Sequence, residues 1–146
     1  MLSVVIDARG SPERLAGLLA QLTAGAVGGL VREVLVIAGR DAAGIEALCE
    51  ATGAQIDGEL ASALQRTKAD WLLLLPAELR FRDGWVERLQ DALAARPRPA
   101  RVVGVKLGGA LDRAARGVLV RRPQALAQPD LHRLGRRLGL AAPRLG

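Results

Sequence analysis

The 146-residue chain is poor in the side chains from which many active sites are built. It contains no Tyr and no Asn, one His, one Cys, and only three Ser and three Thr. A single Cys excludes an intrachain disulfide and any metal site that needs several thiolates. The lone His132 has no Cys, His or paired carboxylate close to it in the sequence, so a metal centre there is not expected. Chemistry must therefore depend on carboxylates and arginines.

Long apolar runs and aromatic clusters are also missing. The longest apolar run, residues 71–77, is far too short to span a membrane. No basic and then apolar leader precedes Leu2, so we expect no cleaved secretory signal and a cytoplasmic protein. Aromatic residues make up 2% of the chain, and none lies beyond residue 95. This scarcity argues against nucleic-acid binding by base stacking.

Charge is distributed unevenly along the chain. Residues 1–95 carry 9 Lys and Arg against 13 Asp and Glu, whereas residues 96–146 carry 12 against 2. The net charges of −4 and +10 indicate an anionic partner for the C-terminal part, such as a phosphate group or a lipid head group. Leucines and arginines intermingle over residues 131–138, so peripheral contact with an anionic membrane surface is one hypothesis. A solvated helix whose leucines pack on the sheet is the favoured alternative.

The apolar pattern predicts strands that alternate with helices. Leu15, Leu18, Leu19 and Leu22 form one face of a helix that Ser11 and Pro12 would begin. Another helix carries Trp85 to Leu93 and would be capped by Asp83. Strands are expected at 2–6, 33–37, 53–57, 71–75, 101–107 and 118–121, and further helices at 42–51, 60–67 and 130–138. This order favours a single α/β domain, a three-layer α/β/α sandwich around a mostly parallel sheet.

Ligands of such sheets bind beyond the carboxyl ends of the strands. The loops to examine are therefore 7–10, 38–41, 76–82 and the segment after residue 107. Five charged residues on these loops are the candidate substrate-binding residues: Asp7, Arg40, Asp41, Arg80 and Arg82. Glu78 could hold a metal ion or a phosphate-bound water. Purely structural roles stay open for two of them, because Asp41 would suit a helix N-cap and Asp7 could form a hydrogen bond with its own local backbone.

Four segments in this order resemble a family 2 glycosyltransferase of the GT-A fold. They are Ser3–Ile6, Arg32–Asp41, Ala69–Arg80 and Gly84–Leu89, and the similarity covers roughly residues 2–95. A weaker similarity is found in 117–122 and 130–137. The resemblance implies a nucleotide-sugar-binding half in residues 1–95 and a basic, shortened C-terminal part in residues 96–146.

The resemblance also implies a reaction and its residues. A nucleotide-diphospho-sugar would donate its sugar to an acceptor that the sequence does not identify. An Asp-x-Asp turn would hold Mg²⁺ or Mn²⁺ against the diphosphate, and Asp130 matches the acid that deprotonates the acceptor. Here the metal turn reads Pro76-Ala77-Glu78, so the motif is degenerate and only Glu78 remains as a metal ligand.

Other positions depart from the family pattern. Asp7-Ala8 replaces the Pro-Thr pair after the first strand, and Ala38 stands where an acidic residue helps to hold the nucleoside. Arginines at Arg40, Arg80 and Arg82 could neutralise phosphates in place of a metal. We therefore expect a glycosyltransferase-like protein of impaired or uncertain activity. The alternative is a non-catalytic module that uses its basic C-terminal part to bind an anionic partner or a membrane surface.

Overall fold

The computed structural model describes residues 1–10, 12–40, 42–105, 114–138 and 144–145. Its centre is a seven-stranded sheet of order β3-β2-β1-β4-β6-β5-β7. Strands β3, β2, β1 and β4 run parallel, β6 is antiparallel to both β4 and β5, and β7 is parallel to β5. The strands are β1 (Leu2–Asp7), β2 (Val31–Ile37), β3 (Gln55–Asp57), β4 (Trp71–Pro76), β5 (Ala100–Val103), β6 (Arg116–Arg121) and β7 (Arg144–Leu145).

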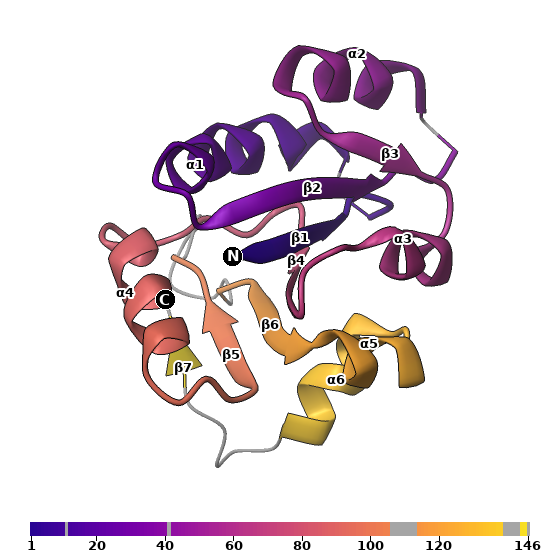
Figure 1. Ribbon diagram of the computed structural model, residues 1–146. Coiled ribbons are helices and arrows are strands. Elements are labelled where there is room, and N and C mark those ends of the chain that lie inside the picture. Colours follow the sequence, from indigo (N-terminus) through magenta and orange to yellow (C-terminus); the bar gives the residue numbers. More distant parts are fainter. Residues whose placement is uncertain (11, 41, 106–113, 139–143, 146) are drawn as a thin grey trace.

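Helices cover both faces of this sheet (Figure 1). Helices α1 (Leu15–Val27), α2 (Ala42–Thr52) and α4 (Trp85–Ala94) pack their apolar side chains against one face. Helices α3 (Leu60–Arg66), α5 (Arg122–Ala127) and α6 (Leu131–Leu138) pack against the other. A short 3₁₀ helix, η1 (Pro12–Arg14), precedes α1. The predicted three-layer α/β/α sandwich with a mostly parallel sheet is confirmed.

The two central strands are apolar on both faces because helices cover both. In β4, Leu73 and Leu75 contact the core beneath α1, whereas Leu72 and Leu74 contact the core beneath α3, α5 and α6. All four leucines are at most 2% exposed. An apolar run without alternation is the pattern expected of a strand buried on both sides, and it places β4 at the middle of the sheet.

Most predicted elements agree with the structure to within a few residues. The leucine face of α1 is buried as expected, but the capping role of Asp83 is wrong. Helix α4 begins after Gly84, whose φ of 80° allows the chain to turn without a side-chain cap. Helix α5 was not predicted from the sequence. It carries Pro123 in its first turn, a position where proline commonly begins a helix. Ser11, Asp41 and residues 106–113 lie outside the described residues.

The strand order creates a topological switch point between β1 and β4. After β1, the chain adds β2 and β3 on one side of that strand and then crosses to add β4 on the other side. This reversal of the strand order creates the switch point at the carboxyl ends of β1 and β4. The register sets Asp7 beside Pro76, and the amide of Ala77 donates to the carbonyl of Asp7 at 3.1 Å. Ligands of open α/β sheets bind at such points.

Close packing at β6 yields a first prediction. A Cβ at Gly117 would lie 2.5 Å from Leu75 Cδ2 and 2.7 Å from the carbonyl oxygen of Leu74. We expect Gly117→Ala to lower the free energy of unfolding by about 1–3 kcal/mol through overpacking. Gly44→Ala is the matched control, because a Cβ there meets nothing within 4 Å and alanine favours the helix by about 0.5–1 kcal/mol. Urea denaturation measures both, and an unchanged midpoint for Gly117→Ala would contradict this packing.

Candidate functional site

A cleft of about 1050 Å³ opens at the switch point. Its walls come from the ends of β1 and β4 and the loops after them, the start of α3, the start of β6, and α6 with the segment before it, with one side chain from β5. Four acidic and four basic side chains are part of the lining: Asp7, Arg9, Glu59, Glu78, Arg101, Arg116, Asp130 and Arg136. The cleft is thus formed by segments from both the acidic and the basic parts of the chain.

Three of the predicted site residues, Asp7, Glu78 and Asp130, line this cleft together. They come from three segments far apart in the sequence, and the parallel β1–β4 pair accounts for the first two. Asp130 lies on the short segment between α5 and α6. Their assigned roles stay predictions, but the geometry gives each of them a distinct local environment.

Asp7 is engaged by Arg9. The carboxylate accepts hydrogen bonds from the Arg9 backbone N–H at 3.1 Å and from its guanidinium Nε at 3.0 Å, and forms an ion pair at 2.9 Å. Burial alone would raise the pKa of Asp7, but the hydrogen bonds and charge of Arg9 outweigh it and lower that pKa. Asp7 therefore forms the local backbone hydrogen bond that was the structural alternative to a ligand-binding role, and it is also part of the cleft wall.

Asp130 caps the N-terminus of α6. Its Oδ1 accepts the backbone N–H of Arg133 at 3.0 Å, and its Oδ2 lies 4.0 Å from Arg133 Nε. The backbone hydrogen bond from Arg133 is the main cause that lowers the pKa of Asp130. The carboxylate is ionised at neutral pH and can accept a proton, although a lowered pKa makes it a weaker base.

Glu78 stands in the turn after β4 and is half-buried. The turn is closed by a hydrogen bond from the Leu79 amide to the Pro76 carbonyl at 3.1 Å. Within the described part of the chain, the Glu78 carboxylate makes no hydrogen bond or ion pair, so among these three acids it is the one with its oxygens available to a ligand.

The donor set does not fit a metal ion held by the protein. Among the described residues, no group of three or more His, Cys, Asp or Glu side chains is placed to hold one. Of the four acids in the cleft, Asp7 is paired with Arg9 and Asp130 caps a helix, which leaves Glu59 and Glu78, and Glu78 is the one in the predicted metal turn. One carboxylate is a poor site for Mg²⁺ or Mn²⁺ unless substrate and water oxygens supply the other ligands.

The predicted arginines lie elsewhere. Arg80 donates to the carbonyls of Ala77, Leu79 and Arg14 at 2.9, 2.8 and 2.6 Å, so its guanidinium fastens the loop after β4 to the start of α1. Arg82 is exposed and does not line the cleft. Arg40 lines a second, smaller pocket of about 510 Å³ beside η1 and α2.

Sequence reasoning missed the arginines that do line the cleft: Arg9, Arg101, Arg116 and Arg136. Arg101 is 7% exposed, an unusual burial for a guanidinium. For Arg101, Arg116 and Arg136, the sequence signal was the excess of positive charge beyond residue 95. Which of those arginines face the cleft depends on the antiparallel β5–β6 register and on the docking of α6, and neither can be read from local sequence.

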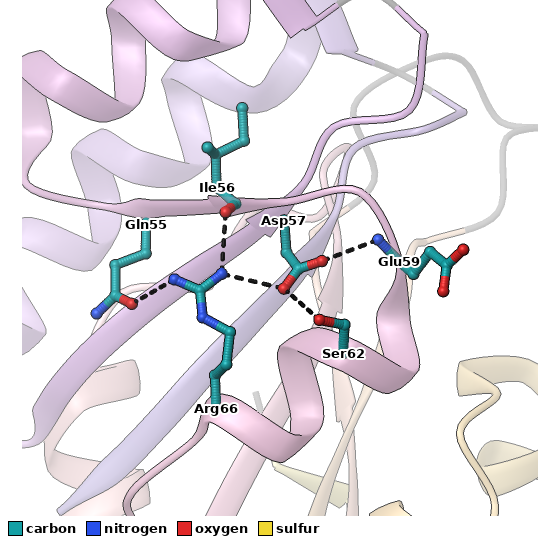
Figure 2. A network of polar contacts seen from close by, with 6 residues as sticks. All are labelled: Gln55, Ile56, Asp57, Glu59, Ser62 and Arg66. Carbon is teal, nitrogen blue, oxygen red and sulfur yellow. Dashed lines mark hydrogen bonds and ion pairs between the residues drawn. The ribbon is translucent and has the colours of Figure 1, made fainter.

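A polar network fixes the start of α3, which forms one wall of the cleft (Figure 2). Asp57 accepts hydrogen bonds from the Glu59 amide at 3.1 Å and from the Ser62 hydroxyl at 2.9 Å. Arg66 bonds the same carboxylate at 3.0 Å and reaches the carbonyl of Ile56 and the amide oxygen of Gln55. The network ties the end of β3 to both ends of α3.

The leucines of α6 face the sheet. Leu134 is fully buried, and Leu131 and Leu138 pack against the same core. Arg133, Arg136 and Arg137 are exposed. This is the arrangement of the favoured alternative, a solvated helix packed on the sheet. In the part of the chain that the structure describes, no helix is long and apolar enough to span a membrane.

Comparison with solved structures identifies the fold. A 4-diphosphocytidyl-2C-methyl-D-erythritol synthase superposes with a TM-score of 0.68 at 10% identity, over 99% of this chain and 87% of the other. The fold is that of GT-A-like nucleotide-sugar transferases. Glucosyl-3-phosphoglycerate synthase from Mycobacterium tuberculosis, in complex with Mn²⁺, UDP and glucosyl-3-phosphoglycerate, matches at 0.60 and 17% identity over 84% of this chain. Mannosyl-3-phosphoglycerate synthase from Rubrobacter xylanophilus matches at 0.54 and 18% identity over 70%.

The chain spans 57% of the length of the Mycobacterium synthase and 38% of the Rubrobacter synthase. No family model matches the sequence, and no curated protein matches it. These identities show a shared fold and do not by themselves transfer an activity. The resemblance to family 2 in particular stays a prediction.

The Asp57 network yields a prediction on pH. Burial would raise the pKa of Asp57, but the Glu59 amide, Arg66 and Ser62 together lower it below the ordinary 3.8. The ionised form is thus favoured by folding, so its contribution to stability is present above about pH 3.8 and is lost as the pH falls further. We expect Asp57→Ala to cost about 1–2 kcal/mol at pH 7 through the lost hydrogen bonds, and the difference from the unmodified protein to shrink below pH 3.8.

Denaturation in urea across this pH range measures the effect, with Asp91→Ala as the control at an exposed helical position. A difference between Asp57→Ala and the unmodified protein that is constant with pH would contradict the assignment.

Proposed function

We propose that the chain binds a nucleotide-diphospho-sugar in the cleft and transfers the sugar to an acceptor. The observation that carries this proposal is the convergence of Asp7, Glu78 and Asp130 on one cleft at the switch point of a GT-A-like sheet. The structural neighbours support it, because they include sugar-transferring synthases, one of them in complex with UDP. They do not favour the non-catalytic alternative.

In the proposed reaction, an acceptor hydroxyl oxygen attacks the anomeric carbon of the donor. The bond between that carbon and the diphosphate oxygen breaks, and the nucleoside diphosphate leaves. Asp130 takes the hydroxyl proton, a role for which its ionised state and its place in the cleft suit it. Glu78 accepts hydrogen bonds from hydroxyl groups of the sugar.

Donor binding is the first test. Calorimetry with UDP-glucose and GDP-mannose is carried out with and without Mn²⁺, since the Mycobacterium neighbour was solved with that ion. We expect one of these donors to bind with a Kd below about 1 mM, equivalent to more than about 4 kcal/mol of binding free energy. Absence of binding by any nucleotide sugar in both conditions would refute the proposal.

The base is tested by Asp130→Asn. Asparagine keeps the N-cap of α6 but cannot accept the proton, so we expect unchanged stability and donor affinity. The rate of UDP release, as the sugar passes to water or to an added acceptor, should fall by about 10²-fold or more. Glu46→Gln on the exposed face of α2 is the charge-matched control. Equal turnover in Asp130→Asn and in this control would remove Asp130 from the reaction.

Nucleotidyl transfer is a second candidate. It is favoured by the match to the diphosphocytidyl synthase, of which the chain spans 87%, whereas it spans 57% of the glucosyl synthase and 38% of the mannosyl synthase. In that reaction a phosphate oxygen of a sugar phosphate attacks the α-phosphorus of a nucleoside triphosphate, and pyrophosphate leaves. Production of pyrophosphate from CTP and a sugar phosphate, without release of a nucleoside diphosphate from nucleotide sugars, would favour this candidate over the first.

A further inference from the structure

Strands β5 and β6 place two arginines side by side on one wall of the cleft. Arg101 pairs with Val118, and Val103 pairs with Arg116. Because side chains alternate along a strand, Arg101 and Arg116 project from the same face as diagonal neighbours, close enough for both long side chains to reach one ligand. That face is the one covered by α6, since Val118 belongs to the core beneath it.

A third arginine lies on the helix that covers this face of the sheet. Arg136, on α6, lines the same cleft as Arg101 and Arg116. Within the described residues, Arg116 and Arg136 form no ion pair, whereas the acids Asp7 and Asp130 are occupied by Arg9 and by the α6 N-terminus. Because the three arginines lie on one wall of the cleft, the positive potential that they create there favours an anionic group of a ligand.

We propose that Arg101, Arg116 and Arg136 form a phosphate-binding wall that neutralises the ligand without a metal ion held by the protein. The proposal deepens and rests on the proposed function, because it names the groups that would neutralise the phosphates in place of a metal ion. Guanidinium groups suit this purpose, since each presents two parallel N–H donors to a pair of phosphate oxygens and stays charged at any working pH.

The phosphate can come from the donor or from the acceptor. The wall lies on the β5, β6 and α6 side of the cleft, and the loops after β1 and β4 lie on the other side. A donor diphosphate at the switch point and a phosphorylated acceptor beside α6 present the same chemistry to these arginines. The experiment therefore uses UDP and inorganic phosphate as separate probes.

Binding of both probes is measured by calorimetry in EDTA and again with Mn²⁺. Arg116→Gln and Arg136→Gln are the test variants, because both side chains are exposed and neither change leaves a buried cavity. Arg32→Gln on β2 and Arg137→Gln on α6 are the controls, since they remove the same charge from exposed positions outside the cleft. Circular dichroism confirms that all four variants remain folded.

We expect binding in EDTA, with affinity lowered about tenfold by either test variant and less than about twofold by either control. UDP that displaces inorganic phosphate assigns the wall to the donor, whereas phosphate that still binds at saturating UDP assigns it to the acceptor. Equal affinities in test and control variants, or binding that requires Mn²⁺, would overturn the proposal.

The two proposals fail in different ways. UDP binding that needs Mn²⁺ and Glu78 would leave the proposed function standing and remove the arginine wall. Phosphate binding that depends on Arg116 without any binding of nucleotides would leave the wall and remove the proposed function.

Discussion

The parallel pairing of β1 with β4 is the constraint on which the rest of the structure depends. Both strands are buried on both faces, and their register runs without interruption from Leu2 beside Trp71 to Asp7 beside Pro76. A shift of one residue would move every side chain of β4 to the opposite core. Correct burial of these strands therefore also sets which side chains emerge at their carboxyl ends, and so couples the core to the cleft.

The electrostatics of the cleft follow from how its charges are partnered. Asp7 and Asp130 each accept a backbone N–H two or three residues further along the chain, and each has a lowered pKa. Such acids hold loops and helix ends in place and are ionised at neutral pH. Arg116 and Arg136 line the same cleft as these acids, in a fold whose solved neighbours include one in complex with Mn²⁺ and UDP.

The sequence predicted the N-terminal half well because its signals are local. The apolar run of β4 and the leucine face of α1 identify buried elements directly, and the rule that parallel strands share a carboxyl edge brings Asp7 and Glu78 together. The arginine wall could not be predicted, because the antiparallel pairing of β5 with β6 aligns residues from separate segments. Arg80 shows the opposite case, since its position in the loop after β4 follows from the local pattern, while its bond to the carbonyl of Arg14 depends on tertiary packing against η1.

The central claim is that the switch-point cleft is where a nucleotide diphosphate binds. The most direct measurement is a crystal structure of the chain with UDP. The account predicts the diphosphate in the cleft between Glu78 and Arg116, within hydrogen-bond distance of at least one guanidinium of the arginine wall. UDP bound at another place, such as the smaller pocket beside Arg40, with the cleft free of phosphate, would contradict it.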